Sequence, residues 1–198
     1  MAYIEMKHSY KRYQTGDTEI IANNDINFAI EKGELVIILG SSGAGKSTVL
    51  NILGGMDNND EGQVIIDGVD IANYSQKELT TYRRNDVGFV FQFYNLVPNL
   101  TAKENVELAS EIVADARDAE QTLIDVGLGK RLNNFPAQLS GGEQQRVLIG
   151  NSLLSDKKIF IFDEPASGLD YEHMLAVGKL LQELKAAGKI VLVITHDK

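Results

Sequence analysis

Four short apolar runs along the chain each end abruptly in glycine or a polar side chain. The runs are LVIIL before Gly40, VGFVF before Gln92, IFIF before Asp163 and Glu164, and IVLVIT before His196. Because polar residues do not alternate with the apolar ones, each run is typical of a strand that is covered on both faces, as in a parallel sheet. The pattern therefore predicts an α/β fold with a parallel sheet and helical crossovers.

Helical periodicity and helix-start signals fall between and after these runs. The stretch 171–189 ends in a glycine suited to close a helix, Gly188, and places several apolar side chains on one helical face: Met174, Val177, Leu180, Leu181 and Leu184. Two further helix starts are predicted where a hydroxyl precedes a glutamate by three residues: Ser75 with Glu78, and Thr101 with Glu104.

The remaining segments predict a flank and an insertion around the parallel sheet. Residues 1–35 and the segment 63–71 alternate apolar and polar positions, which favours an antiparallel β flank. The polar stretch 101–126 lacks strand signals and is expected to form a helical insertion.

Composition narrows the class of protein. A chain of 198 residues with 43% hydrophobic and 24% charged residues is typical of one soluble globular domain. No apolar stretch approaches the roughly 20 residues that span a bilayer, and the N-terminal segment lacks the apolar core of a secretion signal, so we expect a cytoplasmic chain. The net charge of -9 disfavours nucleic acid as a partner, and the absence of cysteine excludes disulfides and thiolate metal sites.

The stretch GSSGAGKST, residues 40–48, has the strongest chemical signal. Gly40, Gly45, Lys46 and Ser47 match G-x-x-x-x-G-K-[ST], in which backbone amides and lysine bind phosphate oxygens and the hydroxyl binds Mg²⁺. The following helix adds its positive N-terminal end. The alternative, a flexible glycine loop, does not explain why a strand precedes it and a helix follows. We interpret the stretch as a nucleoside triphosphate site.

The acidic pair after IFIF is expected to lie at the same place. Ligands in open parallel sheets bind beyond the carboxyl ends of the strands, so the four strand ends should converge. Asp163 is then placed to hold the metal, and Glu164 to orient or deprotonate the attacking water, which implies hydrolysis. Taken alone, the pair is equally consistent with a cap on the next segment.

The stretch LSGGEQQR, residues 139–146, admits two interpretations. Ser140 and Glu143 form the pattern of a capping box at the start of a helix. That leaves Gly141 and Gly142 unexplained, since each glycine in a helix costs up to about 1 kcal/mol relative to alanine. A hydroxyl, bare backbone and a helix N-terminus also suit a second anion site, and both interpretations can hold together.

With these motifs in this order, the chain resembles the nucleotide-binding domain of ATP-binding-cassette (ABC) transporters over essentially its whole length. GSSGAGKS resembles the Walker A loop, Gln92 the Q-loop glutamine, LSGGE the family signature, IFIFDE the Walker B strand, SGLD (167–170) the D-loop, and His196 the switch histidine. The signature discriminates this family from other P-loop proteins.

The resemblance implies a P-loop NTPase fold, RecA-like, with the antiparallel flank and a helical subdomain. Residues 1–92 and 145–198 would form the ATP-binding core, and 93–144 the subdomain. It implies ATP and Mg²⁺ as cofactors, with Glu164, His196 and Lys46 as catalytic residues and Ser47, Gln92 and Asp163 at the metal. The nucleotide would contact Tyr13, Gly40, Ser41, Ser42, Gly43, Ala44, Gly45, Lys46, Ser47, Thr48, Gln92, Ser140, Gly141, Gly142 and Asp170.

By the same resemblance, two such domains dimerise head to tail, so that each ATP lies between Walker A of one copy and LSGGE of the other. The stretch from Gln92 to Val106 would receive a membrane permease subunit on a separate chain. This implies an ATPase bound peripherally at the inner face of the cell membrane, with no nucleic-acid partner.

Several assignments keep simpler alternatives beside them. Gln92 and His196 would be incidental polar residues without the motifs around them, and Tyr10 and Tyr3 compete with Tyr13 as the residue that stacks on adenine. The acidic segments EKGE (31–34) and DNNDEG (57–62) are interpreted as solvated turns without function.

The two halves of the chain resemble different subfamilies. The front half resembles the MacB and LolD exporter group, and the back half resembles the ATPases of cobalt and energy-coupling-factor importers.

The chain departs from the family pattern at two places. Ala166 replaces the usual hydroxyl residue after the DEP. Relatives continue beyond Lys198, so one sheet flank is expected to expose apolar surface. The alternative functions are a regulatory cassette of the cell-division type and a soluble cassette protein of translation or DNA repair.

Overall fold

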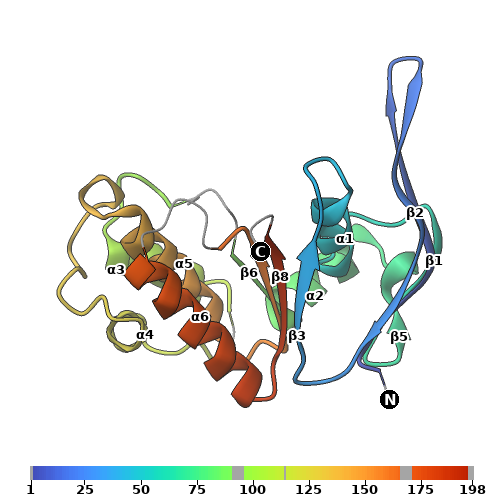
Figure 1. The fold of residues 1–198 in the computed structure, drawn as a ribbon. Helices are drawn as coiled ribbons and strands as arrows, with labels where there is room; N and C mark the ends of the chain where they lie inside the picture. Colours follow the sequence, from blue (N-terminus) through green and yellow to red (C-terminus); the bar gives the residue numbers. More distant parts are fainter. Residues whose placement is uncertain (1, 91–95, 114, 166–170, 196–198) are drawn as a thin grey trace.

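The computed structural model describes residues 2–90, 96–113, 115–165 and 171–195. The N-terminal part forms a four-stranded antiparallel sheet in the order β2-β1-β4-β5. Its strands are β1 (Ile4–Thr15), β2 (Thr18–Ile30), β4 (Glu61–Ile66) and β5 (Val69–Asp70). The predicted antiparallel flank is therefore confirmed (Figure 1).

The four apolar runs form the second sheet, which is parallel throughout and has the order β3-β8-β7-β6. Its strands are β3 (Leu35–Leu39), β6 (Val87–Val90), β7 (Ile159–Asp163) and β8 (Ile190–Thr195). Leu39 pairs with Thr195, and Asp163 pairs with Ile194. This register brings the carboxyl ends of β3, β8 and β7 to one edge of the sheet.

Burial differs between β3 and the other strands of the parallel sheet. Ile159–Phe162 and Ile190–Ile194 are buried, as expected for strands covered on both faces, and Val87 and Val90 of the edge strand β6 are buried too. The expectation is wrong for β3, where Ile37 is 57% and Leu39 55% exposed. The elements that the structure describes therefore leave one face of β3 partly uncovered.

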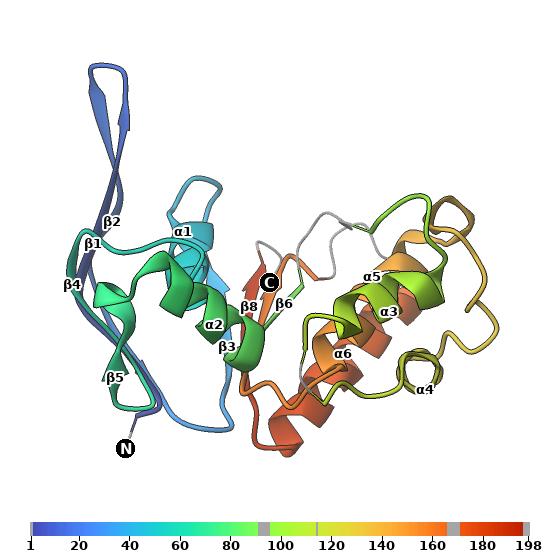
Figure 2. The same cartoon turned by 180° about the vertical axis from the view of Figure 1, so that it is seen from behind.

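Helices cover the two faces of the parallel sheet (Figure 2). Helices α1 (Lys46–Leu53) and α2 (Gln76–Asp86) lie between the two sheets, where α1 packs in one apolar cluster with β1 and β7. Helices α5 (Gly141–Leu153) and α6 (Tyr171–Ala186) lie on the opposite face and pack against a second cluster. The fold is thus the layered α/β arrangement expected from the sequence.

The predicted apolar face of α6 is only partly buried. Val177 and Leu184 are buried, whereas Met174 is 43% exposed and does not join the core. The predicted end of the helix is confirmed: Gly188 adopts a φ of 76°, and its N–H donates to the carbonyl oxygen of Lys185 at 2.9 Å.

The polar stretch 101–126 is helical, as expected, and contains two helices: α3 (Ala102–Ser110) and α4 (Ala119–Asp125). Between them Asp115 has a left-handed φ of 51°, and Asp118 caps α4 by accepting from the N–H of Gln121 at 2.8 Å. These local preferences of aspartate interrupt the helical pattern.

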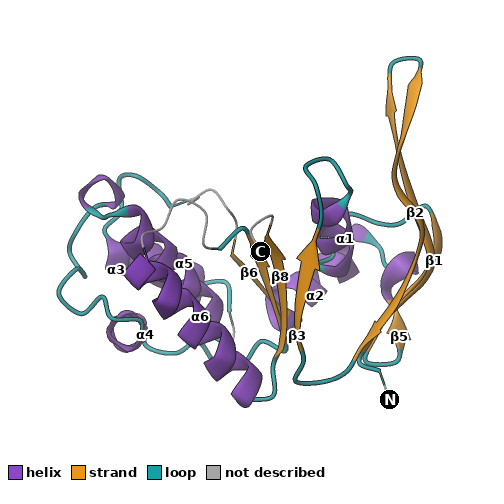
Figure 3. Cartoon of the chain, in the orientation of Figure 1, coloured by secondary structure: helices purple, strands orange, loops and turns teal. Residues whose placement is uncertain are grey.

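Helices α3 and α4 lie on the same side of the molecule as α5 (Figure 3). They share an apolar cluster with Val147 of α5 and with Leu154 just beyond its end. Ile149 on another face of α5 joins the cluster on the parallel sheet instead. Helix α5 therefore continues through position 144 and packs on both the helical layer and the sheet. Short 3-10 turns at Ile71–Asn73 and Pro136–Gln138 complete the described helices, none of which is long and apolar enough to cross a membrane.

Candidate functional site

The loop between β3 and α1 has a backbone that only glycine fits well. Gly43 and Gly45 both adopt a φ of 79°, which L side chains rarely adopt. A Cβ on Gly45 would also lie 2.2 Å from the carbonyl oxygen of Ala22 on β2. The loop is thus folded tightly against the antiparallel sheet, and glycine at position 45 is required by both its conformation and its neighbour.

Lys46 and the start of α1 give this loop its positive character. The Lys46 ammonium donates to the carbonyl oxygens of Gly40 at 2.7 Å and Ser41 at 2.9 Å, so it lies inside the loop. Gly45 is the N-cap of α1 and offers no side chain to its first turn. Amide groups at an uncapped helix N-terminus, together with an ammonium group, form a site for a phosphate anion.

The two predicted carboxylates lie at the end of β7. Burial raises the pKa of Asp163 above its ordinary value, and the neighbouring carboxylate of Glu164 raises it further, while Lys46 partly opposes both effects. Glu164 has a φ of 52°, and its N–H donates to the carbonyl oxygen of Ile194 at 3.0 Å. A left-handed glutamate is unusual and is found preferentially at functional sites.

One cavity of about 680 Å³ is lined by both the glycine loop and the two carboxylates. Its walls include Asp163, Glu164 and the loop residues Ser42, Gly43, Ala44, Gly45, Lys46, Ser47 and Thr48. The predicted convergence of the first and third strand ends is therefore confirmed. Gln92, Asp170 and His196 lie outside the described residues.

Tyr13 is the predicted aromatic residue that lies at this cavity. It is 37% exposed, and its hydroxyl donates to Asp57 at 2.7 Å. Tyr3 is buried in the core, and the ring of Tyr10 lies beneath the Arg12 guanidinium at 5.3 Å. Of the three tyrosines, Tyr13 is thus the one on the cavity wall.

The segment DNNDEG is more than a solvated turn. Its Asp57 accepts from the Lys11 ammonium at 2.8 Å as well as from Tyr13, and Lys11 lies 5.2 Å from the centre of the Tyr13 ring. Burial raises the pKa of Asp57, but the bonds from Lys11 and Tyr13 outweigh it and leave that pKa below its ordinary value. The sequence separation of about forty residues hid this contact.

The segment LSGGE forms the predicted capping box at α5. The Ser140 hydroxyl accepts from the N–H of Glu143 at 3.3 Å, and the Glu143 carboxylate accepts from the N–H of Ser140 at 2.8 Å. The same carboxylate binds the Arg131 guanidinium at 2.8 Å. Ser140, Gly141 and Gly142 do not line the cavity that contains Lys46.

Sequence reasoning missed the contribution of β2 to the cavity. Ile20, Ile21 and Ala22 line it opposite the glycine loop, and Ile194 of β8 closes another side. The signal available in the sequence is the pair of adjacent isoleucines, Ile20 and Ile21, because it breaks the alternation of apolar and polar positions that is typical of a strand with one solvent-facing side.

The donor set at the cavity fits Mg²⁺. The Ser47 hydroxyl and the carboxylates of Asp163 and Glu164 are oxygen ligands, which this ion prefers. No cluster of three or more histidine, cysteine, aspartate or glutamate residues occurs in the described part of the chain. Mg²⁺ suits such a site, since it usually takes one or two protein carboxylates and completes its shell with water and phosphate oxygens.

Comparison with known proteins places these features in a family. The family model described as ABC transporter matches residues 23–167. The chain is 43% identical to the uncharacterized ABC transporter ATP-binding protein MJ1508 of Methanocaldococcus jannaschii, over 98% of this chain and 89% of that protein. It is 42% identical to the macrolide export ATP-binding/permease protein MacB of Pasteurella multocida, over 98% of this chain but only 31% of that protein.

A solved structure agrees with the fold. The ATP-binding cassette MJ0796, in a dimeric post-hydrolysis state bound to ADP and Pi, superposes with a TM-score of 0.90 at 40% identity. The match covers 98% of this chain and 88% of that one. The similarity thus extends over both sheets and the helical layer.

Proposed function

We propose that this chain, which belongs to the ABC transporter family, hydrolyses ATP to drive transport as the ATPase subunit of a membrane transporter. The observation that carries the proposal is the single cavity in which Lys46 of the glycine loop meets the carboxylates of Asp163 and Glu164. A phosphate-binding loop with two acidic groups beside it suits phosphoryl transfer to water. The similarity to MacB of Pasteurella multocida, an ATP-binding/permease protein of which this chain spans 31%, supports a membrane permease as the partner, and we propose that it is a separate chain.

The chemistry follows from the groups on the cavity wall. The amides of the glycine loop and the Lys46 ammonium bind the phosphate oxygens and stabilise the negative charge that develops on them. The Glu164 carboxylate orients a water molecule and accepts its proton as the water oxygen attacks the terminal phosphorus. The bond from that phosphorus to the bridging oxygen breaks, which releases ADP and inorganic phosphate. Mg²⁺ held at Ser47 and Asp163 would neutralise phosphate charge when bound.

Tyr13, Gln92, Asp170 and His196 complete the proposed site. Tyr13 would stack on the adenine ring, held in place by its bond to Asp57. Gln92 is proposed to contact the metal, His196 the terminal phosphate, and Asp170 the nucleotide. These three assignments rest on the motifs in the sequence.

The active form is proposed to be a head-to-tail dimer. Ser140, Gly141 and Gly142 lie away from the cavity of their own chain, which supports their contact with a nucleotide held by a second copy. The dimeric state of the MJ0796 cassette supports the same arrangement. In the transporter, the dimer would bind its permease at the inner face of the membrane.

Size-exclusion chromatography of Glu164→Gln with and without ATP and Mg²⁺ tests this proposal. The substitution removes the proton acceptor and keeps the shape of the side chain, so bound ATP should persist and shift the protein from monomer to dimer. Lys46→Ala is the matched control, since it removes the phosphate ligand and should remain monomeric. Identical elution of the two variants in ATP would contradict the dimer mechanism.

A further inference from the structure

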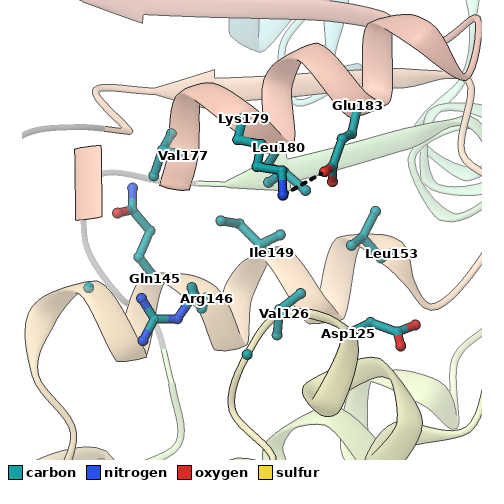
Figure 4. Close-up of a pocket in the computed structure, with 12 residues that line it drawn as sticks. Asp125, Val126, Gln145, Arg146, Ile149, Leu153, Val177, Lys179, Leu180 and Glu183 are labelled. Atoms are coloured by element: carbon teal, nitrogen blue, oxygen red, sulfur yellow. Dashed lines mark ion pairs between the residues drawn. The ribbon is translucent and has the colours of Figure 1, made fainter. Parts of the chain in front are cut away.

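A second cavity, of about 370 Å³, lies between α5 and α6, away from the glycine loop (Figure 4). One face of α5 supplies Gln145, Arg146, Ile149 and Leu153, and α6 supplies Val177 and Leu180 opposite them. The end of α4 closes the cavity at Asp125, Val126 and Gly127. A space of this size is within the range of small-molecule sites.

The cavity is mainly apolar, and two residues on its wall carry buried polar atoms. Within the described part of the chain, the Oε1 atom of Gln145, a residue that is 4% exposed, accepts no hydrogen bond, and the buried Nε atom of Arg146 donates none. Unpaired buried polar atoms are rare in folded proteins, because each loses its bonds to water without replacement. Both atoms are closed off from solvent, so a ligand reaches them only by displacing the Gln145 or Arg146 side chain.

The charge balance of the walls favours an anion. Glu183 pairs with Lys179 at 3.7 Å, and Asp125 pairs with Arg117 at 2.5 Å, so the nearby acids already have cations of their own. Among the residues that the structure describes, none forms an ion pair with the Arg146 guanidinium. Arg146 therefore contributes the uncompensated charge, and guanidinium groups bind carboxylates especially well.

We propose that the cavity between α5 and α6 binds a small amphiphilic carboxylate with a branched or aromatic apolar body. The carboxylate would accept from Arg146, and the apolar body would pack between Ile149 and Leu153 of α5 and Val177 and Leu180 of α6.

The cavity is joined to the proposed catalytic site through Gln145. Its Nε2 group donates to the carbonyl oxygen of Pro165, the residue that follows Glu164, and Gly142 of LSGGE lies on the cavity wall. A ligand that moves Gln145 would therefore shift the segment after Glu164 and the LSGGE segment. We expect such a shift to change the ATPase rate. This effect rests on the proposed function, whereas binding to the cavity does not.

Calorimetric titration of the full chain with 4-phenylbutyrate tests the site. Two matched probes separate its features: 4-phenyl-1-butanol has the apolar body without the charge, and butyrate has the charge without the body. We expect saturable binding of phenylbutyrate at one site, at least about fivefold tighter than either probe. Lys46→Ala should bind it equally well, which separates this cavity from the nucleotide site. Absence of saturable phenylbutyrate binding up to about 10 mM would overturn the proposal.

Two charge variants locate the binding residue. Arg146→Met keeps the length of the side chain and should weaken phenylbutyrate binding by about tenfold or more, to the level of the alcohol. Lys179→Met removes a charge from the same cavity wall but one already paired with Glu183, and should change the affinity less than about twofold. Equal effects of the two substitutions would overturn the assignment to Arg146.

A third variant tests the location without relying on charge. Leu180→Trp fills the cavity from α6 and should abolish binding of both phenylbutyrate and the alcohol. Because the wild-type titration needs no substitution, a variant that fails to fold does not remove the test. Unchanged binding in a folded Leu180→Trp protein would place the ligand elsewhere and contradict the proposal.

Discussion

At the scale of single residues, the Asp163 carboxylate at the end of β7 lies where its ionised form is disfavoured. Burial and the adjacent Glu164 raise the pKa of Asp163, which means that its ionised form is less favourable in the folded chain than in the unfolded one. Glu164 has a left-handed backbone as well. Such features are stable only where the surrounding fold enforces them, and they suit a site that is completed by a cation.

Asp163→Asn is expected to stabilise the protein at neutral pH while abolishing Mg²⁺-dependent ATPase activity. A folded pKa above the unfolded one lowers stability as pH rises through that interval. The amide carries no such penalty, so Tm should rise. Thermal unfolding followed by circular dichroism without nucleotide measures this shift.

The same measurement at about pH 3 provides the control, since both side chains are then neutral in both states. The gain in Tm should shrink there. A lower Tm for Asp163→Asn at pH 7 would contradict this. It would show that attraction between the Asp163 carboxylate and Lys46 stabilises the folded chain more than burial of the charge and repulsion from Glu164 destabilise it.

At the scale of elements, three helices begin with the same local device. Ser75, Thr101 and Ser140 each accept from the N–H of the glutamate three residues later and receive that carboxylate on their own N–H. Because all of these contacts lie within four consecutive residues, sequence reasoning identified each of them. Only for Ser140 is a second, intermolecular role proposed.

A pair of substitutions separates capping from that second role. Ser140→Ala and Thr101→Ala should each lower the free energy of unfolding by about 1 kcal/mol, because each removes one N-cap. Only Ser140→Ala, introduced into the Glu164→Gln background, should also weaken ATP-dependent dimerisation. Denaturant titration and size-exclusion chromatography give the two readouts, and equal dimerisation of both variants would assign Ser140 to capping alone.

The glycine loop allows a similarly matched test. Gly43 and Gly45 have the same φ of 79°, but a Cβ on Gly43 meets nothing within 4 Å, whereas one on Gly45 meets the Ala22 carbonyl oxygen at 2.2 Å. Gly43→Ala should therefore lower the free energy of unfolding by about 1–2 kcal/mol, the cost of a left-handed alanine. Gly45→Ala should lower the free energy of unfolding clearly more in the same denaturant titration. Equal losses of stability in the two variants would mean that β2 moves away from position 45 without a cost.

At the scale of the whole molecule, the helices cover some strands of the parallel sheet more completely than others. Its central strands are buried by helices on both faces, while β3 at the edge exposes Ile37 and Leu39. Exposed apolar side chains on an edge strand favour association with another chain.

Ile37→Lys is expected to reduce self-association that occurs without nucleotide. The side chain is more than half exposed, so the free energy of unfolding should change by less than about 0.5 kcal/mol. Light scattering over a range of protein concentrations measures the effect. An unchanged concentration dependence would show that this edge does not associate, and ATP-dependent dimerisation in the Glu164→Gln background serves as the control for a correct fold.

Features that depend on neighbouring residues were predictable without coordinates. Strand runs, capping boxes, the glycine at the end of α6 and the Walker-type loop are set by local sterics and hydrogen bonds, and the shared carboxyl edge follows from the parallel sheet. Motif order then identified the family without coordinates.

Features that depend on contacts between distant residues became visible in the folded chain alone. Packing made β3 an edge strand, left Met174 outside the core, and placed Tyr13 rather than Tyr3 at the cavity. The bond between Tyr13 and Asp57 and the cavity between α5 and α6 join segments far apart in the chain. Burial and side-chain pairing depend on which surfaces meet in three dimensions, and a periodic pattern along one segment does not specify that partner.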